Sequence, residues 1–507
     1  MDIRLTIEKL LRYAKTHLQL EKDDELYFRN ILLNRLYVDE PYDGELNLDY
    51  IDSLEVPDSI LEEVKEYLLS IGNTSPELLI TEIMGLLSPL PSKVVFLTKE
   101  LEKAKSGLGL DYLYNLSIKN NYIQKTAIDK NLYFKKEYEN NFLEITINLS
   151  KPEKNNKDIA KLLVKSDKKE KYPKCALCKE NLGYKGRSDH PSRVNIRILP
   201  LKLNNENWFL QYSPYAYFYK HAIIINDNHS NMSINDDTFL KLLEFVDQYP
   251  TFFVGSNADL PIVGGSILNH EHYQGGAHLL PVFFSKDRKV YLDDGKVKIS
   301  ILDWYNSTLR IESRDLNEVV KYSRLIFNKW KDYNDESVEI ISHTNETRHS
   351  TITPIARKVD DTYSMNLILR NNRCNDEHKD GIFHAHKEYH HIKQEGIGLI
   401  EAMGLFILPP RLKRQMGYIN EILSSNDDLE NYYSKYEDLI IHKDMITYLV
   451  NKYGRNLDNE TREEAIKDYI ADTCRNILIN TAVFKNTELG NKALDKFMEV
   501  VLYEVRN

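Results

Sequence analysis

The spacing of apolar residues predicts helices in the first part of the chain. Apolar side chains recur three and four positions apart from Ile3 onward and again from Leu61 onward, which is typical of amphipathic helices. Apolar and polar residues then alternate over 142–149, and this pattern predicts a strand. We therefore expect residues 1–150 to form a mainly helical N-terminal region.

Shorter elements are predicted after a stretch that is rich in lysine. Residues 151–174 contain nine lysines and predict a solvated linker. Beyond this linker, period-two and helical patterns alternate along the chain. They predict strands at 208–212, 221–225, 252–254 and 363–369, and helices at 239–246 and 316–327.

The order of these elements predicts how the rest of the chain is divided. A similar series of strand, turn, helix and His-x-His occurs in 175–300 and again in 301–415, which indicates an internal duplication. Residues 416–507 return to a helical pattern. We therefore predict two related halves followed by a helical C-terminal region.

Composition and charge exclude several classes of protein. The 507 residues are 42% hydrophobic and 28% charged, which excludes a largely disordered chain, and four cysteines exclude a secreted disulfide framework. No stretch approaches the roughly 18 apolar residues of a membrane span. The net charge of −10 argues against nucleic acid as a partner. Charged residues stand where a signal peptide has its apolar core, so we expect a cytoplasmic protein that contacts no membrane.

The most informative motif is 259–276, which reads DLPIVGGSILNHEHYQGG. On a strand, alternate residues share one face, so His270, His272 and Gln274 are predicted to point the same way. A neutral imidazole can attack phosphorus and form a phosphoramidate. The alternatives for such a pair are surface histidines or a simple metal pair.

A glycine-rich loop leads into this predicted strand. Its residues are Gly264, Gly265 and Ser266. Because glycine has no Cβ, backbone N–H groups of such a loop can approach phosphate oxygens closely. The loop and the histidines together predict a site for a phosphorylated substrate.

A second motif is the Cys-x-x-Cys formed by Cys175 and Cys178. This spacing is typical of metal or redox chemistry in a cytosolic chain. No βαβ pattern follows the pair, which argues against a thioredoxin-like role. Metal binding and an unmetallated pair of thiols both remain open from the residues alone.

The His-x-His-x-Gln motif resembles the nucleotidyltransferase branch of the histidine triad superfamily, in which glutamine replaces the third histidine. An amide cannot titrate, but it can donate a hydrogen bond to a phosphoryl oxygen, so transfer is favoured over hydrolysis. Within that branch, the chain is similar to the second bacterial family of UDP-glucose–hexose-1-phosphate uridylyltransferases over about 110–415. The chain differs from this family at one position of the motif: directly before His270 a small residue is expected, but the sequence has Asn269. The supporting stretches are 144–154, 175–178, 208–215, 255–261 and 390–404.

The resemblance implies an activity and roles for particular residues. The activity is exchange of UMP between UDP-glucose and galactose 1-phosphate through a covalent uridylyl-histidine, in a ping-pong order. His272 would be the nucleophile, with His270 beside it and Gln274 in contact with the phosphoryl group. The implied substrate-binding residues are Asn257, Gly264, Gly265 and Ser266 for phosphate and Glu401 for hexose hydroxyls.

The resemblance also implies an α+β fold and a structural zinc ion. Two histidine-triad-like halves would supply antiparallel strands, with helical additions at both ends. The better-studied enterobacterial and animal type of these uridylyltransferases, the sister family, forms homodimers. The implied zinc ligands are Cys175, Cys178, His229 and His270, a closed set for tetrahedral Zn²⁺.

A second metal site of the sister family uses another His-x-His pair. His384 and His386 resemble this pair, but 363–368 lacks the third histidine. These histidines, with His390 and His391, are therefore interpreted as either phosphate contacts or surface residues. Two other functions stay open: a dinucleoside polyphosphate phosphorylase of the same branch, and a non-catalytic zinc-stapled binding protein.

Overall fold

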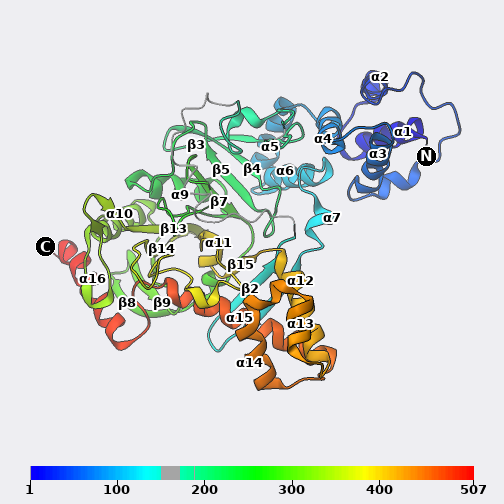
Figure 1. The fold of residues 1–507 in the computed structure, drawn as a ribbon. Helices are drawn as coiled ribbons and strands as arrows, with labels where there is room; N and C mark the ends of the chain where they lie inside the picture. The colour runs from blue at the N-terminus through cyan, green and yellow to red at the C-terminus, as the bar shows by residue number, and fades with distance from the viewer. Residues whose placement is uncertain (1, 150–171, 188, 266, 507) are drawn as a thin grey trace. The chain divides into compact units, whose positions relative to one another are not determined.

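The computed structural model describes residues 2–149, 172–187, 189–265 and 267–506 (Figure 1). Most of the predicted linker at 151–174 lies outside these residues, as does Ser266. The chain forms two units, each assembled from separate stretches of sequence. The first unit contains Met1–Asp129, Asp167–Ser230 and His270–Gly276, and the second contains Lys130–Ser166, Asn231–Asn269 and Ala277–Asn507.

Helices form the N-terminal part of the first unit, as the apolar spacing predicts. The first helix begins after Asp2, whose carboxylate accepts a hydrogen bond from the Arg4 backbone N–H. This N–H has no partner within the helix, so Asp2 stabilises the helix start. Leu10 and Val64 are fully buried on the predicted apolar faces. The helices are α1 (Ile3–His17), α2 (Glu25–Arg35), α3 (Asp58–Ser70), α4 (Pro76–Leu87), α5 (Pro91–Ala104), α6 (Leu108–Lys119) and α7 (Lys125–Ile128).

Four antiparallel strands of the first unit carry the histidine motif. Their order is β3 (Leu199–Leu203), β4 (Glu206–Tyr212), β5 (Ala222–Asn226) and β7 (His272–Gly276). The strands predicted at 208–212 and 221–225 are confirmed as β4 and β5.

The register of these strands separates the two faces of β7. Ile225 lies opposite His272 and Ile223 opposite Gln274, so the two polar residues share one face. On the other face, Tyr273 stacks on Trp208, with ring centroids 4.7 Å apart. The motif strand is therefore anchored by a buried aromatic pair on the side away from His272.

A three-stranded sheet of the second unit contains the strand predicted at 142–149. β2 (Phe142–Ile147) pairs antiparallel with β1 (Leu132–Glu137) and parallel with β15 (Leu405–Leu408). Because β2 is the central strand, the polar residue Glu144 is buried rather than exposed. Its carboxylate lies 2.7 Å from the His278 imidazole, so the buried acid has an ionic or hydrogen-bonding partner.

Six antiparallel strands and two helices form the larger part of the second unit. The helices α9 (Asp236–Gln248) and α10 (Leu316–Asp332) pack against β13 and against each other. They confirm the helices predicted at 239–246 and 316–327. The strand order is β6 (Phe253–Gly255), β13 (Ser350–Val359), β14 (Thr362–Asn371), β10 (Thr308–Ser313), β9 (Val297–Leu302) and β8 (Asp287–Asp293).

Helices follow to the end of the chain, which confirms the α+β class. A short helix α11 (Leu399–Ala402) precedes β15, and a two-residue pair of strands, β11 (His343–Thr344) and β12 (Thr347–Arg348), lies before β13. The boundaries predicted for the five domains stay a prediction. The C-terminal helices are α12 (Arg411–Ser424), α13 (Leu429–Lys435), α14 (Lys443–Tyr453), α15 (Asn459–Thr481) and α16 (Glu488–Arg506).

In the described parts of the chain, no single helix is long and apolar enough to cross a membrane. Only α4 and α5 taken together pass that test by length and composition, and they are bent by 58° at the break between them.

Candidate active site and metal centre

The strand that carries the histidine motif begins at a later residue than the sequence predicts. β7 begins at His272, so His272 and Gln274 lie on the strand and His270 precedes it. The segment is fixed by backbone hydrogen bonds: the Glu271 N–H donates to the Ser230 carbonyl at 2.7 Å, and the Asn226 N–H donates to the Glu271 carbonyl at 3.1 Å. The prediction that all three polar residues share one strand is therefore correct only for His272 and Gln274.

His272 is held as a neutral imidazole with a defined tautomer. Its side chain is buried, and its Nδ1 lies 2.8 Å from the backbone carbonyl of His270. A carbonyl can only accept, so Nδ1 carries the proton and Nε2 carries the lone pair. Burial lowers the pKa of His272 to about 4. This is the protonation state that a histidine nucleophile requires at neutral pH.

Gln274 is oriented by a histidine that the sequence analysis did not identify. His221 Nε2 lies 2.9 Å from Gln274 Oε1 and donates to it, since the amide oxygen is an acceptor. The His221 side chain is buried, and burial lowers its pKa to about 4, so the ring is neutral. With its oxygen engaged by His221, the carboxamide has its NH₂ group as the remaining donor.

The position of His221 explains why sequence reasoning missed it. It lies directly before β5, and it stacks on Tyr217 with ring centroids 5.3 Å apart. In sequence it is 53 residues from Gln274. Only the β5–β7 pairing, which places Ile223 opposite Gln274, brings the two side chains together. No local spacing signal links them.

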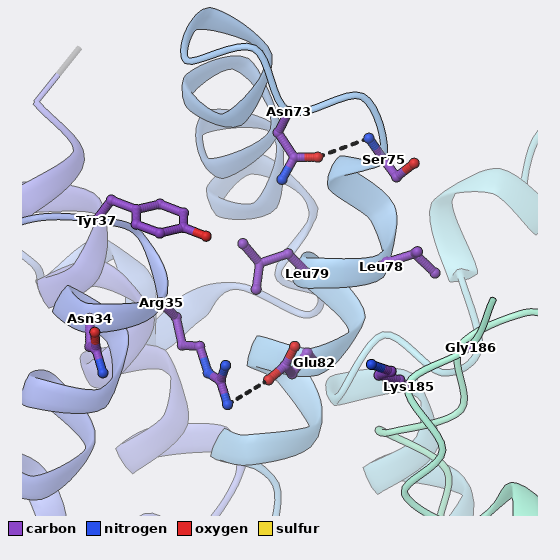
Figure 2. Close-up of a pocket in the computed structure, with 10 residues that line it drawn as sticks. All are labelled: Asn34, Arg35, Tyr37, Asn73, Ser75, Leu78, Leu79, Glu82, Lys185 and Gly186. Atoms are coloured by element: carbon purple, nitrogen blue, oxygen red, sulfur yellow. Dashed lines mark hydrogen bonds and ion pairs between the residues drawn. The ribbon is translucent and has the colours of Figure 1, made fainter. Parts of the chain in front are cut away.

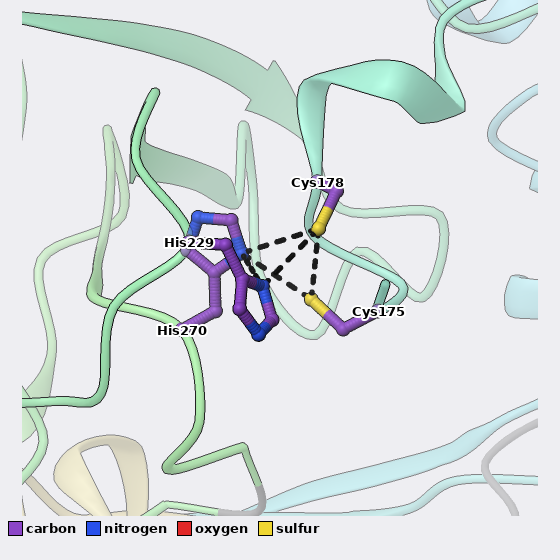
Figure 3. A group of neighbouring side chains, drawn as sticks. All are labelled: Cys175, Cys178, His229 and His270. Atoms are coloured by element: carbon purple, nitrogen blue, oxygen red, sulfur yellow. Dashed lines mark hydrogen bonds between the residues drawn. The ribbon is translucent and has the colours of Figure 1, made fainter. Parts of the chain in front are cut away.

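Two thiols and two imidazoles converge in the first unit (Figure 3). The ligand atoms of Cys175, Cys178, His229 and His270 all lie within 4.8 Å of one another. Cys175 Sγ is 3.5 Å from Cys178 Sγ and 3.2 Å from His270 Nδ1. His229 Nδ1 is 3.3 Å from Cys178 Sγ and 3.3 Å from His270 Nδ1. The four residues that the sequence predicts as metal ligands are therefore brought together.

These separations fit a tetrahedral metal site. Four ligands at about 2.0–2.3 Å from a Zn²⁺ ion stand roughly 3.3–3.8 Å from each other. His270 Nε2 lies 2.8 Å from the Asn226 carbonyl and donates to it, which leaves the Nδ1 lone pair facing the thiols. The hydrogen bond from Cys175 lowers the pKa of Cys178, and the same contact raises the pKa of Cys175. The cluster can therefore hold a metal ion.

The glycine loop lies in the second unit, closely packed around Asn257. A Cβ on Gly265 would stand 2.7 Å from Asn257 Nδ2, and a Cβ on Gly264 would stand 2.6 Å from the Ala258 and Leu260 carbonyls. Asn257 Oδ1 accepts the Leu399 N–H at 2.8 Å. Only glycine fits at these two positions, as expected for a loop whose backbone makes close contacts.

Glu401, predicted to bind hexose hydroxyls, is a buried member of an ion pair. Its Oε1 lies 3.1 Å from Lys393 Nζ, and the same ammonium donates to the Ile407 carbonyl at 2.9 Å. Glu401 Oε2 lies 3.6 Å from the position that a Cβ on Gly398 would take. The sequence analysis did not predict Lys393, because nothing in the local pattern marks a fully buried lysine.

Both histidines of the second His-x-His pair make hydrogen bonds with backbone groups. His384 Nε2 accepts the Ile397 N–H at 3.3 Å, and His386 Nε2 donates to the Ile382 carbonyl at 3.0 Å. Within the described ranges, the Cys175 cluster is the only group of three or more His, Cys, Asp or Glu residues with converging ligand atoms.

A separate polar pocket of about 530 Å³ lies in the helical part of the first unit (Figure 2). Arg35 and Glu82, two of its lining residues, form an ion pair with an N–O distance of 3.0 Å. None of the residues predicted for the active site contributes to it. Its lining residues are Asn34, Arg35, Tyr37, Asn73, Ser75, Leu78, Leu79, Glu82, Lys185 and Gly186.

Two family models match the chain. Residues 21–231 match "Galactose-1-phosphate uridyl transferase, N-terminal domain", and residues 244–436 match "Galactose-1-phosphate uridyl transferase, C-terminal domain". Among solved structures, a DUF4931 family protein from Bacillus cereus aligns with 35% of this chain at 13% identity and a TM-score of 0.25, which is too low to inform the site.

Curated relatives match nearly the whole chain. Galactose-1-phosphate uridylyltransferases from Caldanaerobacter subterraneus and Fusobacterium nucleatum are each 41% identical over 98% of this chain, and cover 98% and 99% of their own lengths. The enzyme of the same name from Clostridium acetobutylicum is 40% identical over 98% of this chain and 99% of its own. The chain therefore belongs to the galactose-1-phosphate uridylyltransferase family.

Proposed function

We propose that this protein exchanges UMP between UDP-glucose and galactose 1-phosphate through a covalent uridylyl-His272 intermediate. The observation that carries the proposal is the state of His272, a buried neutral imidazole whose Nδ1–H is held by the His270 carbonyl. Family membership supports the substrates. A non-catalytic binding protein has no need of such an imidazole.

The reaction takes place in two displacements at the α-phosphorus. His272 Nε2 attacks, an N–P bond forms, and the P–O bond to glucose 1-phosphate breaks with its electron pair on the departing phosphate. The imidazolium that results keeps Nδ1–H on the His270 carbonyl. A phosphate oxygen of galactose 1-phosphate then attacks, the N–P bond breaks, and neutral His272 is restored. The leaving group is already a phosphate, so positioning and hydrogen bonds supply the catalysis.

Other residues of the chain are assigned supporting roles. Gln274 donates from its NH₂ group to a phosphoryl oxygen, and His221 is a positioning residue that fixes the carboxamide. The glycine loop, Gly264 to Ser266, binds phosphate through backbone N–H groups. Asn257 adds a carboxamide to that loop, and Glu401 accepts hydrogen bonds from hexose hydroxyls.

The metal of the Cys175 cluster is assigned as Zn²⁺. Two thiolates and two imidazoles form a closed set that leaves no open position, so the ion is structural. Bound there, it would tie the Cys-x-x-Cys segment to His270, two residues before the start of β7. The ligands would be Cys175, Cys178, His229 and His270.

The protein is expected to act in the cytoplasm on small molecules, with no nucleic acid or membrane partner. Assembly as a homodimer stays a prediction from the resemblance.

Replacing His272 by Ala is expected to lower the rate of UDP-galactose formation by at least about a thousandfold, because the nucleophile is lost. Initial rates of the wild type should give parallel lines in double-reciprocal plots. His343→Ala, on the exposed β11, is the control and should retain full activity. Near-normal turnover by His272→Ala would refute the assignment of His272 as the nucleophile. If the wild type catalysed phosphorolysis of diadenosine tetraphosphate faster than UDP-galactose formation, the phosphorylase alternative would be favoured.

Replacing His221 by Phe is expected to lower kcat about tenfold to a hundredfold with little change in KM for UDP-glucose. The ring volume is kept but the hydrogen bond that orients Gln274 is lost. His221→Gln offers an N–H donor and should recover part of kcat. Equal thermal midpoints would exclude a folding effect. If the Phe and Gln variants have the same kcat as the wild type, His221 does not position Gln274.

Replacing Cys178 by Ser is expected to reduce bound zinc from about one ion per chain to near zero and to lower the thermal midpoint, because one of four ligands is removed. Elemental analysis of the purified chains measures the metal. Cys374→Ser changes an exposed thiol outside the cluster and should keep the ion. Full zinc content in Cys178→Ser, or none in the wild type after exposure to zinc, would contradict the assignment.

A further inference from the structure

One buried carboxamide holds the backbone of the Cys-x-x-Cys loop. Asn181 ends the short 3-10 helix Lys179–Asn181, which follows Cys178, and the residue is only 2% exposed. Its Nδ2 donates to the Cys175 carbonyl at 2.9 Å and to the Cys178 carbonyl at 2.8 Å. The two residues that supply the thiols of the cluster are therefore joined through their carbonyls by a single side chain.

A buried histidine fixes the orientation of this carboxamide. Because the NH₂ group faces two carbonyls, the atom on the other side is the oxygen, which can only accept a hydrogen bond. His190 Nε2 lies 2.6 Å from Asn181 Oδ1 and donates to it. The His190 ring also packs edge-on against Tyr184, with ring centroids 5.6 Å apart. His190 therefore keeps the NH₂ group of Asn181 directed at the Cys-x-x-Cys backbone.

Backbone hydrogen bonds hold His190 and Asn181 in place. The His190 N–H donates to the Arg187 carbonyl at 3.1 Å, and the Arg187 N–H donates to the His190 carbonyl at 2.9 Å. The Tyr184 N–H donates to the Asn181 carbonyl at 2.9 Å, and the Arg193 N–H donates to the Tyr184 carbonyl at 2.8 Å. These four bonds give the His190 ring a fixed position relative to Asn181.

The thiols need such support because they lie close together. Cys175 Sγ is 3.5 Å from Cys178 Sγ. As metal ligands both sulfurs are thiolates, and two like charges at this distance repel each other. The Cys178 N–H donates to the Cys175 carbonyl at 3.3 Å, which is longer than usual and a weak constraint on its own. The two hydrogen bonds from Asn181 add the restraint that keeps the loop closed.

We propose that Asn181 and His190 are positioning residues of the Cys175 cluster and that they set its affinity for a metal ion. Asn181 acts directly on the loop, and His190 acts through Asn181. Loss of a hydrogen bond that orients metal ligands typically costs about tenfold to a hundredfold in metal affinity. His190 does not belong to the group of converging ligand atoms, so its effect on the metal is indirect. The assignment of the metal as Zn²⁺ rests on the proposed function, whereas the hydrogen bonds of Asn181 and His190 do not.

Titration of the full-length, metal-free protein with zinc, in competition with a chromophoric chelator, tests the proposal without turnover. Asn181→Leu keeps the approximate size of the side chain but loses both donated hydrogen bonds. It is expected to bind zinc about tenfold to a hundredfold more weakly than the wild type. Asn34→Leu, the control, changes an exposed asparagine on α2 of the same unit and should bind zinc as the wild type does.

Variants of His190 test whether it acts through Asn181. His190→Phe keeps a ring but has no donor, so the carboxamide loses its orientation and zinc affinity should fall about tenfold. His190→Gln provides an N–H donor and should recover part of the affinity. With cobalt(II) in place of zinc, the visible absorption of the metal–thiolate site should be weaker in the Phe variant than in the Gln variant.

The outcomes separate these positioning roles from a purely structural one and from the proposed function. Equal zinc affinity of the wild type, Asn181→Leu and His190→Phe would overturn the proposal, even if the metal-free variants had lower thermal midpoints. A wild type that binds neither zinc nor cobalt would refute both the zinc assignment and the positioning roles. Zinc binding that depends on Asn181, in a protein that transfers no uridylyl group, would support the positioning roles and refute the proposed function. If Asn181→Leu fails to fold, as judged by circular dichroism, the comparison of His190→Phe with His190→Gln decides.

Discussion

Two backbone carbonyls set the chemistry of the motif by orienting two imidazoles in opposite senses. His270 donates from Nε2 to the Asn226 carbonyl, so its Nδ1 faces the thiols. His272 donates from Nδ1 to the His270 carbonyl, so its lone pair is on Nε2. His270 thereby presents a lone pair to the thiols, and His272 has its lone pair on the other ring nitrogen. The strand begins only at His272, so the two histidines lie in different backbone settings.

The supporting contacts act on this pair of imidazoles from both faces of the strand. On one side, the Tyr273–Trp208 stack fixes β7, as strongly buried aromatic pairs do. On the other side, His221 holds the oxygen of Gln274. Burial of His272 and His221 keeps both rings neutral, because a charged imidazole is poorly solvated in the interior. Desolvation and hydrogen bonding therefore act together to define the protonation of the site.

The sequence was sufficient for elements with strong periodicity, and the Cys-x-x-Cys spacing together with the family resemblance was sufficient for the four residues of the Cys175 cluster. The helix at 239–246 and the strand at 363–369 follow from side-chain spacing, and Cys175 and Cys178 from their separation. His221 and Lys393 could not be predicted, because tertiary packing alone gives them a role. Tertiary packing also decides the burial of β2. Its alternating sequence pattern is typical of a strand with one exposed face, but β2 is a central strand and Glu144 is buried.

The covalent intermediate on His272 is the central claim, and intact-mass spectrometry after mixing with UDP-glucose tests it most directly. The wild type is predicted to gain the mass of one uridylyl group, located on His272 by peptide mapping and lost again on addition of galactose 1-phosphate. A protein that forms UDP-galactose without ever gaining this mass, or that carries the group on another residue, would contradict the account.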